Sequence, residues 1–164
     1  MADLERFRNA QDDPRAGFAT ALAELRAGRK TSHWIWYILP QLATLGRSSM
    51  ARRFGLADVD EAAAYLRDPV LGARLAEAVA AIHGHVTGSR PIPIETLMGS
   101  HVDALKLVSC LTLFRHVARA LSVAESRPAW TTLAEEAQAI LDVARAQGLP
   151  PCAFTEEQCR ADPR

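Results

Sequence analysis

The pattern of apolar and polar residues predicts helices along almost the whole chain. Alanine-rich stretches place apolar side chains at intervals of three and four, while β-branched residues are scattered and no segment alternates cleanly between apolar and polar. Residues 14–28, for example, place Phe18, Leu22 and Leu25 on one face, and residues 69–84 carry a similar apolar stripe. The sequence therefore predicts an all-α protein.

Capping signals divide this pattern into about seven to nine helices of mixed length. Aspartate followed by proline, at Asp13 and Asp68, is typical of an N-cap before a helix with proline in its first turn. Asp58 and Glu61 have the spacing of a capping box, and Ser100 precedes the most apolar segment. Further helices are expected after an Asp3 cap, over residues 47–54, in a short turn before Gly99, and over about 131–147. Ser32 is expected to cap a turn that begins at His33, and Pro40 should keep this aromatic segment short and bent.

The most apolar helix, about residues 102–121, is expected to lie at the centre of a compact single-domain bundle. Its apolar residues surround much of the helix circumference, which is typical of a helix buried on all sides. No repeat or shift in composition divides residues 1–164, so we expect one domain. The helix over about 131–147 should stop at Gly148, because Pro150 and Pro151 follow it, and the tail of about 149–164 is weakly determined.

Composition narrows the class of protein without indicating an activity. Hydrophobic residues make up 49% of the chain and charged residues 23%, as in ordinary globular proteins. Nineteen basic residues balance nineteen acidic ones, so no net field attracts nucleic acid or an anionic membrane. The N-terminus lacks the apolar run of a signal peptide, and no stretch approaches the roughly 18 uninterrupted apolar residues of a membrane span. We therefore expect a cytoplasmic protein.

The three cysteines, Cys110, Cys152 and Cys159, are expected to be free thiols in a reducing compartment. A link between Cys152 and Cys159, or a metal site, is the less favoured alternative because the usual zinc spacings are absent. The sequence gives no reason to expect a metal or a cofactor.

Polar residues interrupt the apolar central helix at intervals of three. They are Asp103, Lys106, Ser109 and Thr112. Because residues three apart on a helix are neighbours, Asp103 and Lys106 can pair. One interpretation is a surface pair with serine and threonine hydroxyls bonded back to the helix; the other is that these costly polar groups face a cleft.

Residues 30–46 concentrate aromatic surface beside polar groups, which is typical of either a core corner or a stacking pocket. Trp34, Tyr37 and Ile38 share helical spacing and are expected in the core. Trp36 points elsewhere on the turn and is freer to line a cleft, with Gln41 available to orient a polar edge.

Several cationic and hydroxyl groups near this stretch suit an anion. Lys30, Ser32 and His33 flank the tryptophans, while Arg47 and Ser48 stand at the start of a helix, where backbone N–H groups and the helix dipole favour negative charge. A phosphate or carboxylate ligand is therefore conceivable here. An imidazole beside tryptophans is more often structural than a base or metal ligand.

Four ordered motifs carry a resemblance to a known family. They are Lys30-x-Ser32-His33-Trp34-x-Trp36-Tyr37-x-x-Pro40-Gln41-Leu42, Leu45-Gly46-x-Ser48, Ala64-Tyr65-Leu66-x-x-Pro69-x-Leu71-Gly72-x-Arg74-Leu75, and Gly99-x-x-x-Asp103-x-x-Lys106-Leu107-x-Ser109-x-x-Thr112-Leu113-Phe114. The chain resembles the bacterial family called domain of unknown function 1810. This resemblance implies a small all-helical domain and no established activity. The chain departs from the family pattern at Cys110-Leu111, where Ser-Met is commoner, and in its cysteine-containing tail.

Two hypotheses from different classes follow. In the first, the aromatic stretch and the central helix form a pocket for a small anionic or nucleotide-like ligand, with Trp34 or Trp36 stacking on a ring. Asp103 and Lys106 would be its candidate catalytic residues for N-glycosidase-like hydrolysis of an ADP-ribose-type substrate. This chemistry is suggested by a similarity, at the level of the fold alone, to helical NAD- and ADP-ribose-associated N-glycosidases. In the second, the chain is a non-catalytic protein-binding or structural domain.

Overall fold

The computed structural model describes residues 3–164, and this part of the chain contains ten α-helices, one short 3-10 helix and no β-strand. The all-α prediction is confirmed, and the number of helices exceeds the expected seven to nine. In chain order the elements are α1 (Glu5–Gln11), α2 (Phe18–Arg26), α3 (Ile35–Ile38), η1 (Ala43–Leu45), α4 (Ser49–Phe54), α5 (Val59–Arg67), α6 (Pro69–Thr87), α7 (Ile94–Met98), α8 (His101–Glu125), α9 (Pro128–Ala146) and α10 (Ala153–Ala161).

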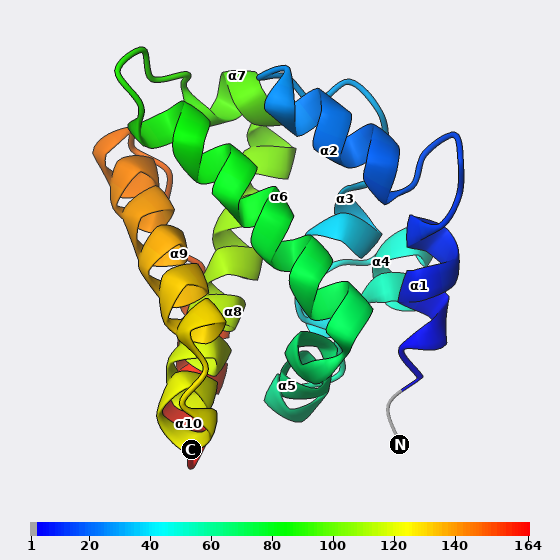
Figure 1. Ribbon diagram of the computed structural model, residues 1–164, viewed down its shortest axis with the longest axis vertical. Helices are drawn as coiled ribbons and strands as arrows, with labels where there is room; N and C mark the ends of the chain where they lie inside the picture. Colours follow the sequence, from blue (N-terminus) through cyan, green and yellow to red (C-terminus); the bar gives the residue numbers. More distant parts are fainter. Residues whose placement is uncertain (1–2) are drawn as a thin grey trace.

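Helix α8 lies at the centre of the fold, as predicted. Every residue from 107 to 114 is buried, so more than two consecutive turns are covered on all sides. Helix α9 packs along α8 (Figure 1), and α8 is also in contact with α5, α7 and α10. By length and composition α8 could cross a membrane, but 61% of its apolar window is buried inside the fold. That burial is what a core helix shows.

Helix α6 forms a second layer over the core. It packs against α9, α2 and α5, and Figure 1 shows it crossing the front of the molecule between α9 and α2. Its buried positions include the predicted stripe of Leu71, Leu75, Val79 and Ile82. One connected apolar cluster joins residues of the first helix to residues of the last.

Most predicted caps are present, and three are wrong. Ser32 does not cap the aromatic segment, because α3 begins at Ile35 with Trp34 as its N-cap. Asp68 accepts hydrogen bonds from the N–H groups of Val70 and Leu71, with Pro69 as the first residue of α6. Asp13 instead accepts from the N–H groups of Arg15 and Ala16, which closes a turn, and α2 begins only at Phe18. Asp3 does not cap α1, whose N-cap is Leu4.

The tail, for which no element was predicted, forms α10. The buried side chains of Thr155 and Cys159 face the core, and α10 contacts α8. The proline pair at 150–151 ends α9 but does not prevent a new helix from starting at Ala153. All three cysteines are free thiols, as expected. Burial raises the pKa of the Cys159 thiol to about 11.

Candidate functional site

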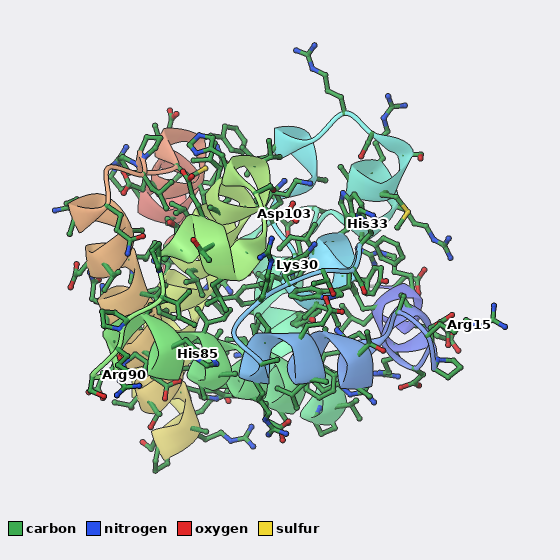
Figure 2. All side chains as sticks on the ribbon, turned by 90° about the horizontal axis from the view of Figure 1, so that it is seen from above. Arg15, Lys30, His33, His85, Arg90 and Asp103 are labelled. Carbon is green, nitrogen blue, oxygen red and sulfur yellow. The ribbon has the colours of Figure 1, made fainter. Side chains whose placement is uncertain are left out.

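The loop between α2 and α3 packs against the turn between α7 and α8, and a hollow of about 300 Å³ opens where they meet. We call it the Lys30 pocket. Figure 2 shows Lys30, His33 and Asp103 close together, away from Arg15 and Arg90 at the periphery. The pocket is lined by Lys30, Thr31, Ser32, His33, Ile35, Trp36, Met98, Gly99, Ser100 and Asp103.

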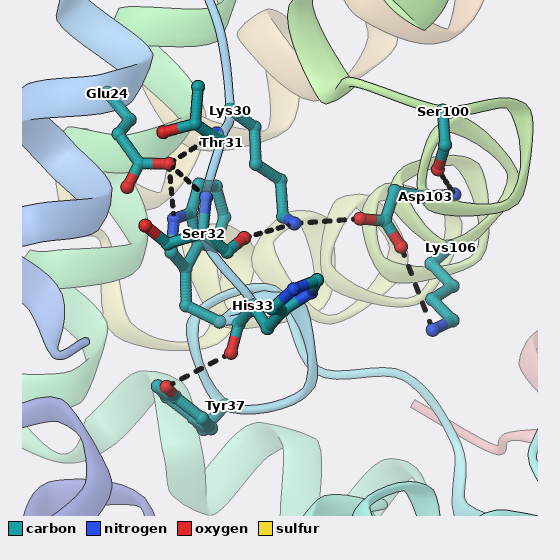
Figure 3. A network of polar contacts seen from close by, with 10 residues as sticks. Glu24, Lys30, Thr31, Ser32, His33, Tyr37, Ser100, Asp103 and Lys106 are labelled. Carbon is teal, nitrogen blue, oxygen red and sulfur yellow. Dashed lines mark hydrogen bonds and ion pairs between the residues drawn. The ribbon is translucent and has the colours of Figure 1, made fainter.

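Two lysines meet one carboxylate at this pocket. Lys30 Nζ lies 2.8 Å from Asp103 Oδ2, and Lys106 Nζ lies 3.7 Å from Asp103 Oδ1 (Figure 3). These are the only two lysines in the 164-residue chain, whose other 17 basic residues are arginines. The predicted pairing of Asp103 with Lys106 is therefore present, but the shorter ion pair of Asp103 is with Lys30. The three groups together carry one net positive charge.

Lys30 is a buried cation, with only 7% of the residue exposed. Its Nζ donates to the Ser32 carbonyl at 2.5 Å as well as pairing with Asp103, and it lies 5.0 Å from the centre of the Trp34 ring. A buried ammonium group without such partners would cost several kcal/mol. These contacts therefore fix Lys30 in one position in the wall of the pocket.

The two tryptophans of the loop and helix α3, Trp34 and Trp36, have different environments, as predicted. Trp34 is fully buried, whereas Trp36 is half-buried and lines the pocket. Lys106 Nζ lies 4.8 Å from the centre of the Trp36 ring. Since a cation over an indole face is attracted by its quadrupole, Lys106 is held over the Trp36 ring.

Glu24 of α2 holds the loop that carries the pocket residues. Its Oε1 atom accepts hydrogen bonds from the backbone N–H groups of Thr31 and Ser32 and from Trp34 Nε1 (Figure 3). Partial burial alone would raise the pKa of the Glu24 carboxyl, but the hydrogen bonds from Thr31 and Ser32 outweigh burial and lower that pKa to about 2. Glu24 is therefore ionised at neutral pH.

Gly99 allows the close approach between the loop and α8. Its φ of +82° is in the left-handed region, and an added Cβ would lie 2.8 Å from the Lys30 carbonyl oxygen. The Lys30 N–H donates to the Leu97 carbonyl at 2.7 Å, just before this turn. Next in the chain, Ser100 caps α8 by accepting from the Asp103 N–H at 3.1 Å. This turn thus sets the positions of both members of the Lys30–Asp103 pair.

The structure brings only part of the predicted site together. Lys30, Ser32, His33, Trp36 and Asp103 line the pocket, with Lys106 adjacent to it. The His33 side chain is exposed, and in Figure 3 its ring lies beside the gap between Lys30 and Lys106. Within residues 3–164 no three histidine, cysteine or acidic side chains are grouped to hold a metal.

Six predicted ligand-binding residues lie outside the lining of the pocket, and one of them is the fully buried Trp34. Ser48 caps α4 by accepting from the Ala51 N–H, and Arg47 before it is exposed. The backbone of Gln41 pairs with Leu56. The remaining two, Ser109 and Thr112, have hydroxyls that bond back to their own helix, which was one of the two interpretations of these residues.

The hydroxyls of Ser109 and Thr112 bond back along α8. Ser109 Oγ donates to the Leu105 carbonyl at 3.2 Å, and Thr112 Oγ1 donates to the Val108 carbonyl at 2.7 Å. Both residues are buried, so these bonds satisfy hydroxyls that would otherwise be costly in the core.

Sequence reasoning missed Glu24, Thr31, Met98 and Gly99 as contributors to the site. Glu24 reads as an ordinary polar residue of an amphipathic helix, and only the path of the later loop gives it its role. Gly99 immediately before the Ser100 cap is a signal that could have indicated a tight turn.

Comparison with known proteins places the fold but not the activity. A family described as protein of unknown function (DUF1810) matches residues 1–130, which include every residue that lines the Lys30 pocket. The crystal structure of the conserved hypothetical protein Rv1873 from Mycobacterium tuberculosis is 34% identical, covers 93% of each chain and superposes with a TM-score of 0.74. Among curated proteins, none matches this chain.

Proposed function

The chain belongs to the DUF1810 family, and we propose that its Lys30 pocket binds a small anionic, nucleotide-like ligand. The observation that carries this proposal is the convergence of both lysines of the chain on Asp103, which lines the pocket. One carboxylate balances one ammonium group, so one positive charge is left for a phosphate or carboxylate group.

The rest of the lining suits the polar and aromatic parts of such a ligand. Ser32 and Ser100 offer hydroxyls, and the half-buried Trp36 offers a flat apolar face. A volume of about 300 Å³ is at the lower end for small-molecule pockets, which favours a ligand of mononucleotide size or part of a larger one.

Binding would require Lys106 to move. In the free protein Lys106 lies over Trp36 and near Asp103, and 23% of its side chain is exposed. An incoming phosphate would attract its ammonium group away from the indole and expose the ring for stacking. Lys30 is buried and held by two oxygens, so it would act as a fixed charge.

N-glycosidic hydrolysis of an ADP-ribose-type compound is the reaction that this residue set would serve. Asp103 would stabilise positive charge on the sugar as the base leaves with the electrons of the carbon–nitrogen bond, and water would then add to the sugar carbon. Lys106 would hold a phosphate oxygen. In the free protein two ammonium groups offset the charge of Asp103. Catalysis would therefore depend on the ligand drawing Lys106 away, which makes binding the primary proposal and hydrolysis its extension.

The alternative is a non-catalytic protein-binding or structural domain. The observation that favours it is the buried Lys30–Asp103 pair, which ties the loop after α2 to α8 without any ligand. Under this alternative the pocket is a by-product of loop packing, and small nucleotides have no effect on stability.

A thermal-shift panel of AMP, ADP-ribose and NAD separates these functions. A ligand held at about 100 times its Kd adds about 2.7 kcal/mol to the free energy of unfolding. We expect stabilisation of the wild type, its loss in Lys106→Ala, and its retention in Arg90→Ala, which removes an exposed cation far from the pocket. A flat response of the wild type to the whole panel would overturn the proposal.

Hydrolysis has a separate test. Any ligand that binds is incubated with the wild type and with Asp103→Asn, and release of its base is followed by chromatography. Release by the wild type alone supports the reaction, whereas binding without release leaves a ligand-binding protein.

A further inference from the structure

A second cluster of cations lies further along α8. Arg115 and Arg119, one turn apart, both donate to the side-chain oxygen of Gln138 on α9, each at 3.0 Å. They border a hollow of about 420 Å³ that α10 closes on the other side, and we call it the Arg115 pocket. Its lining residues are Arg115, His116, Arg119, Glu156, Cys159 and Arg160.

The two guanidinium groups of α8 share a neutral partner where a carboxylate would be expected. Among residues 3–164, no acidic oxygen lies within 4.0 Å of either of them. Arg115 Nε is buried and has no hydrogen-bond partner within these described residues. Like charges four residues apart destabilise a helix, and a buried donor without a partner is costly. The arrangement therefore lacks a counter-ion.

Other titratable groups around the cluster do not supply that counter-ion. Glu156 and Asp142 attract Arg115 from beyond ion-pair distance, and Asp142 already accepts from Gln138 Nε2 at 2.8 Å. His116 is paired with Asp162. Burial and the neighbouring Arg119 together lower the pKa of the Arg115 guanidinium.

We propose that the Arg115 pocket binds a small phosphate-bearing anion, either inorganic phosphate or a phosphate monoester. Guanidinium groups match the geometry of phosphate oxygens with paired N–H donors, so Arg115 and Arg119 can each donate to the same group. Arg160 adds a third cation at the rim, against the single carboxylate of Glu156 in the lining. An anion that accepts from both guanidinium groups would replace the neutral Gln138 oxygen as their shared acceptor.

Size and charge favour a small ligand over nucleic acid. Basic and acidic residues balance over the chain, so no net charge attracts a phosphate backbone, and a hollow lined by six residues suits a small anion. Gln138 and Arg160 also lie beyond the residues that match the DUF1810 family. The two pockets share no lining residue, and part of the Arg115 pocket lies outside the family match.

The arginine Nε–H resonances of nitrogen-15-labelled protein test the proposal directly. Inorganic phosphate and glycerol phosphate are titrated separately, with sodium chloride at equal ionic strength as the reference. We expect a saturable shift of the Arg115 Nε–H signal, which is assigned by its disappearance in Arg115→Lys. The free ion and the ester are distinguished by which titration saturates at the lower concentration.

Matched variants locate the binding. Arg119→Gln removes an exposed cation and should weaken affinity about tenfold while the backbone amide spectrum stays folded. Arg15→Gln, at the opposite side of the molecule (Figure 2), and Lys106→Gln, beside the Lys30 pocket, should leave it unchanged. A shift no larger than that from chloride, equal affinity in Arg119→Gln, or loss of the response in Lys106→Gln would each overturn the proposal.

Discussion

Lys30 Nζ lies 2.8 Å from Asp103 Oδ2, and this ion pair joins a loop from the first quarter of the chain to the first turn of the central helix. Only 5% of the Lys30 side chain and 17% of the Asp103 side chain are exposed. Because ion pairs of low exposure are screened less than surface pairs, the two residues should depend on each other energetically.

A double-mutant cycle measures that dependence. We expect Lys30→Met to lower the free energy of unfolding by about 2–3 kcal/mol, because it leaves the Asp103 carboxylate with only the more distant Lys106. In the cycle of Lys30→Met and Asp103→Asn, urea unfolding should give a coupling energy of about 1–3 kcal/mol. The more exposed pair of Arg74 and Asp12 is the control and should give below about 1 kcal/mol. Equal coupling in both cycles would contradict a special role for Lys30.

Glu24 should make stability depend on pH in the acidic range. Its folded pKa of about 2 lies below its ordinary value of 4.5, so its contribution is fully present above pH 4.5 and is lost as the pH falls toward 2. Allowing for solvent screening of a partly exposed carboxylate, we expect Glu24→Gln to cost about 1–2 kcal/mol at pH 7.

The difference between the wild type and Glu24→Gln should shrink as the pH is lowered through this range. Chemical unfolding at a series of pH values measures it, and Glu77→Gln on the exposed face of α6 is the control. A constant difference between pH 7 and pH 2 would show that Glu24 acts through its shape and not its charge.

Local signals predicted the helices well because capping and periodicity depend on neighbouring residues. The burial of residues 107–114 follows from the apolar circumference of α8, and the Asp68 cap follows from the proline after it. The same aspartate and proline signal failed at Asp13, because a carboxylate that accepts from nearby N–H groups closes a turn as readily as it caps a helix. Helix α10 was missed because its two buried contacts, Thr155 and Cys159, make sense only beside α8.

The site was predictable only where its partners are close in the sequence. Asp103 and Lys106 are one turn apart, so their pairing could be expected. The Lys30–Asp103 pair and the Glu24 contacts to Thr31 and Ser32 depend on the path of a loop. Conversely, Arg47 and Ser48 have suitable chemistry for an anion, but the chain places them outside the lining of the Lys30 pocket.

Trp34 and Trp36 should lose different amounts of stability when each is replaced by alanine. Trp34 is fully buried, so Trp34→Ala should cost about 3–5 kcal/mol through the cavity that it leaves. Trp36 is half-buried beside the Lys30 pocket, and Trp36→Ala should cost about 1–2 kcal/mol. Urea unfolding followed by circular dichroism measures both. A loss of more than about 3 kcal/mol in Trp36→Ala would identify Trp36 as a core residue and argue against a stacking role.

Two glycine substitutions test whether the turn before α8 sets the site. Gly99→Ala should cost about 2–4 kcal/mol, because its positive φ disfavours a side chain and the new Cβ would lie 2.8 Å from the Lys30 carbonyl oxygen. Gly84→Ala is the matched control, since Gly84 lies within α6 and its Cβ would meet nothing within 4 Å. It should raise stability by about 0.5–1 kcal/mol through better helix propensity.

The change in unfolding free energy of Gly99→Ala decides whether the turn fixes the site. If Gly99→Ala were as stable as the wild type, the loop could shift away from α8 at no cost, and the Lys30–Asp103 distance would not be imposed by the turn. If it is destabilised and also loses nucleotide binding that Gly84→Ala retains, then the close approach at Gly99 holds the cation and the carboxylate in the positions that a ligand requires.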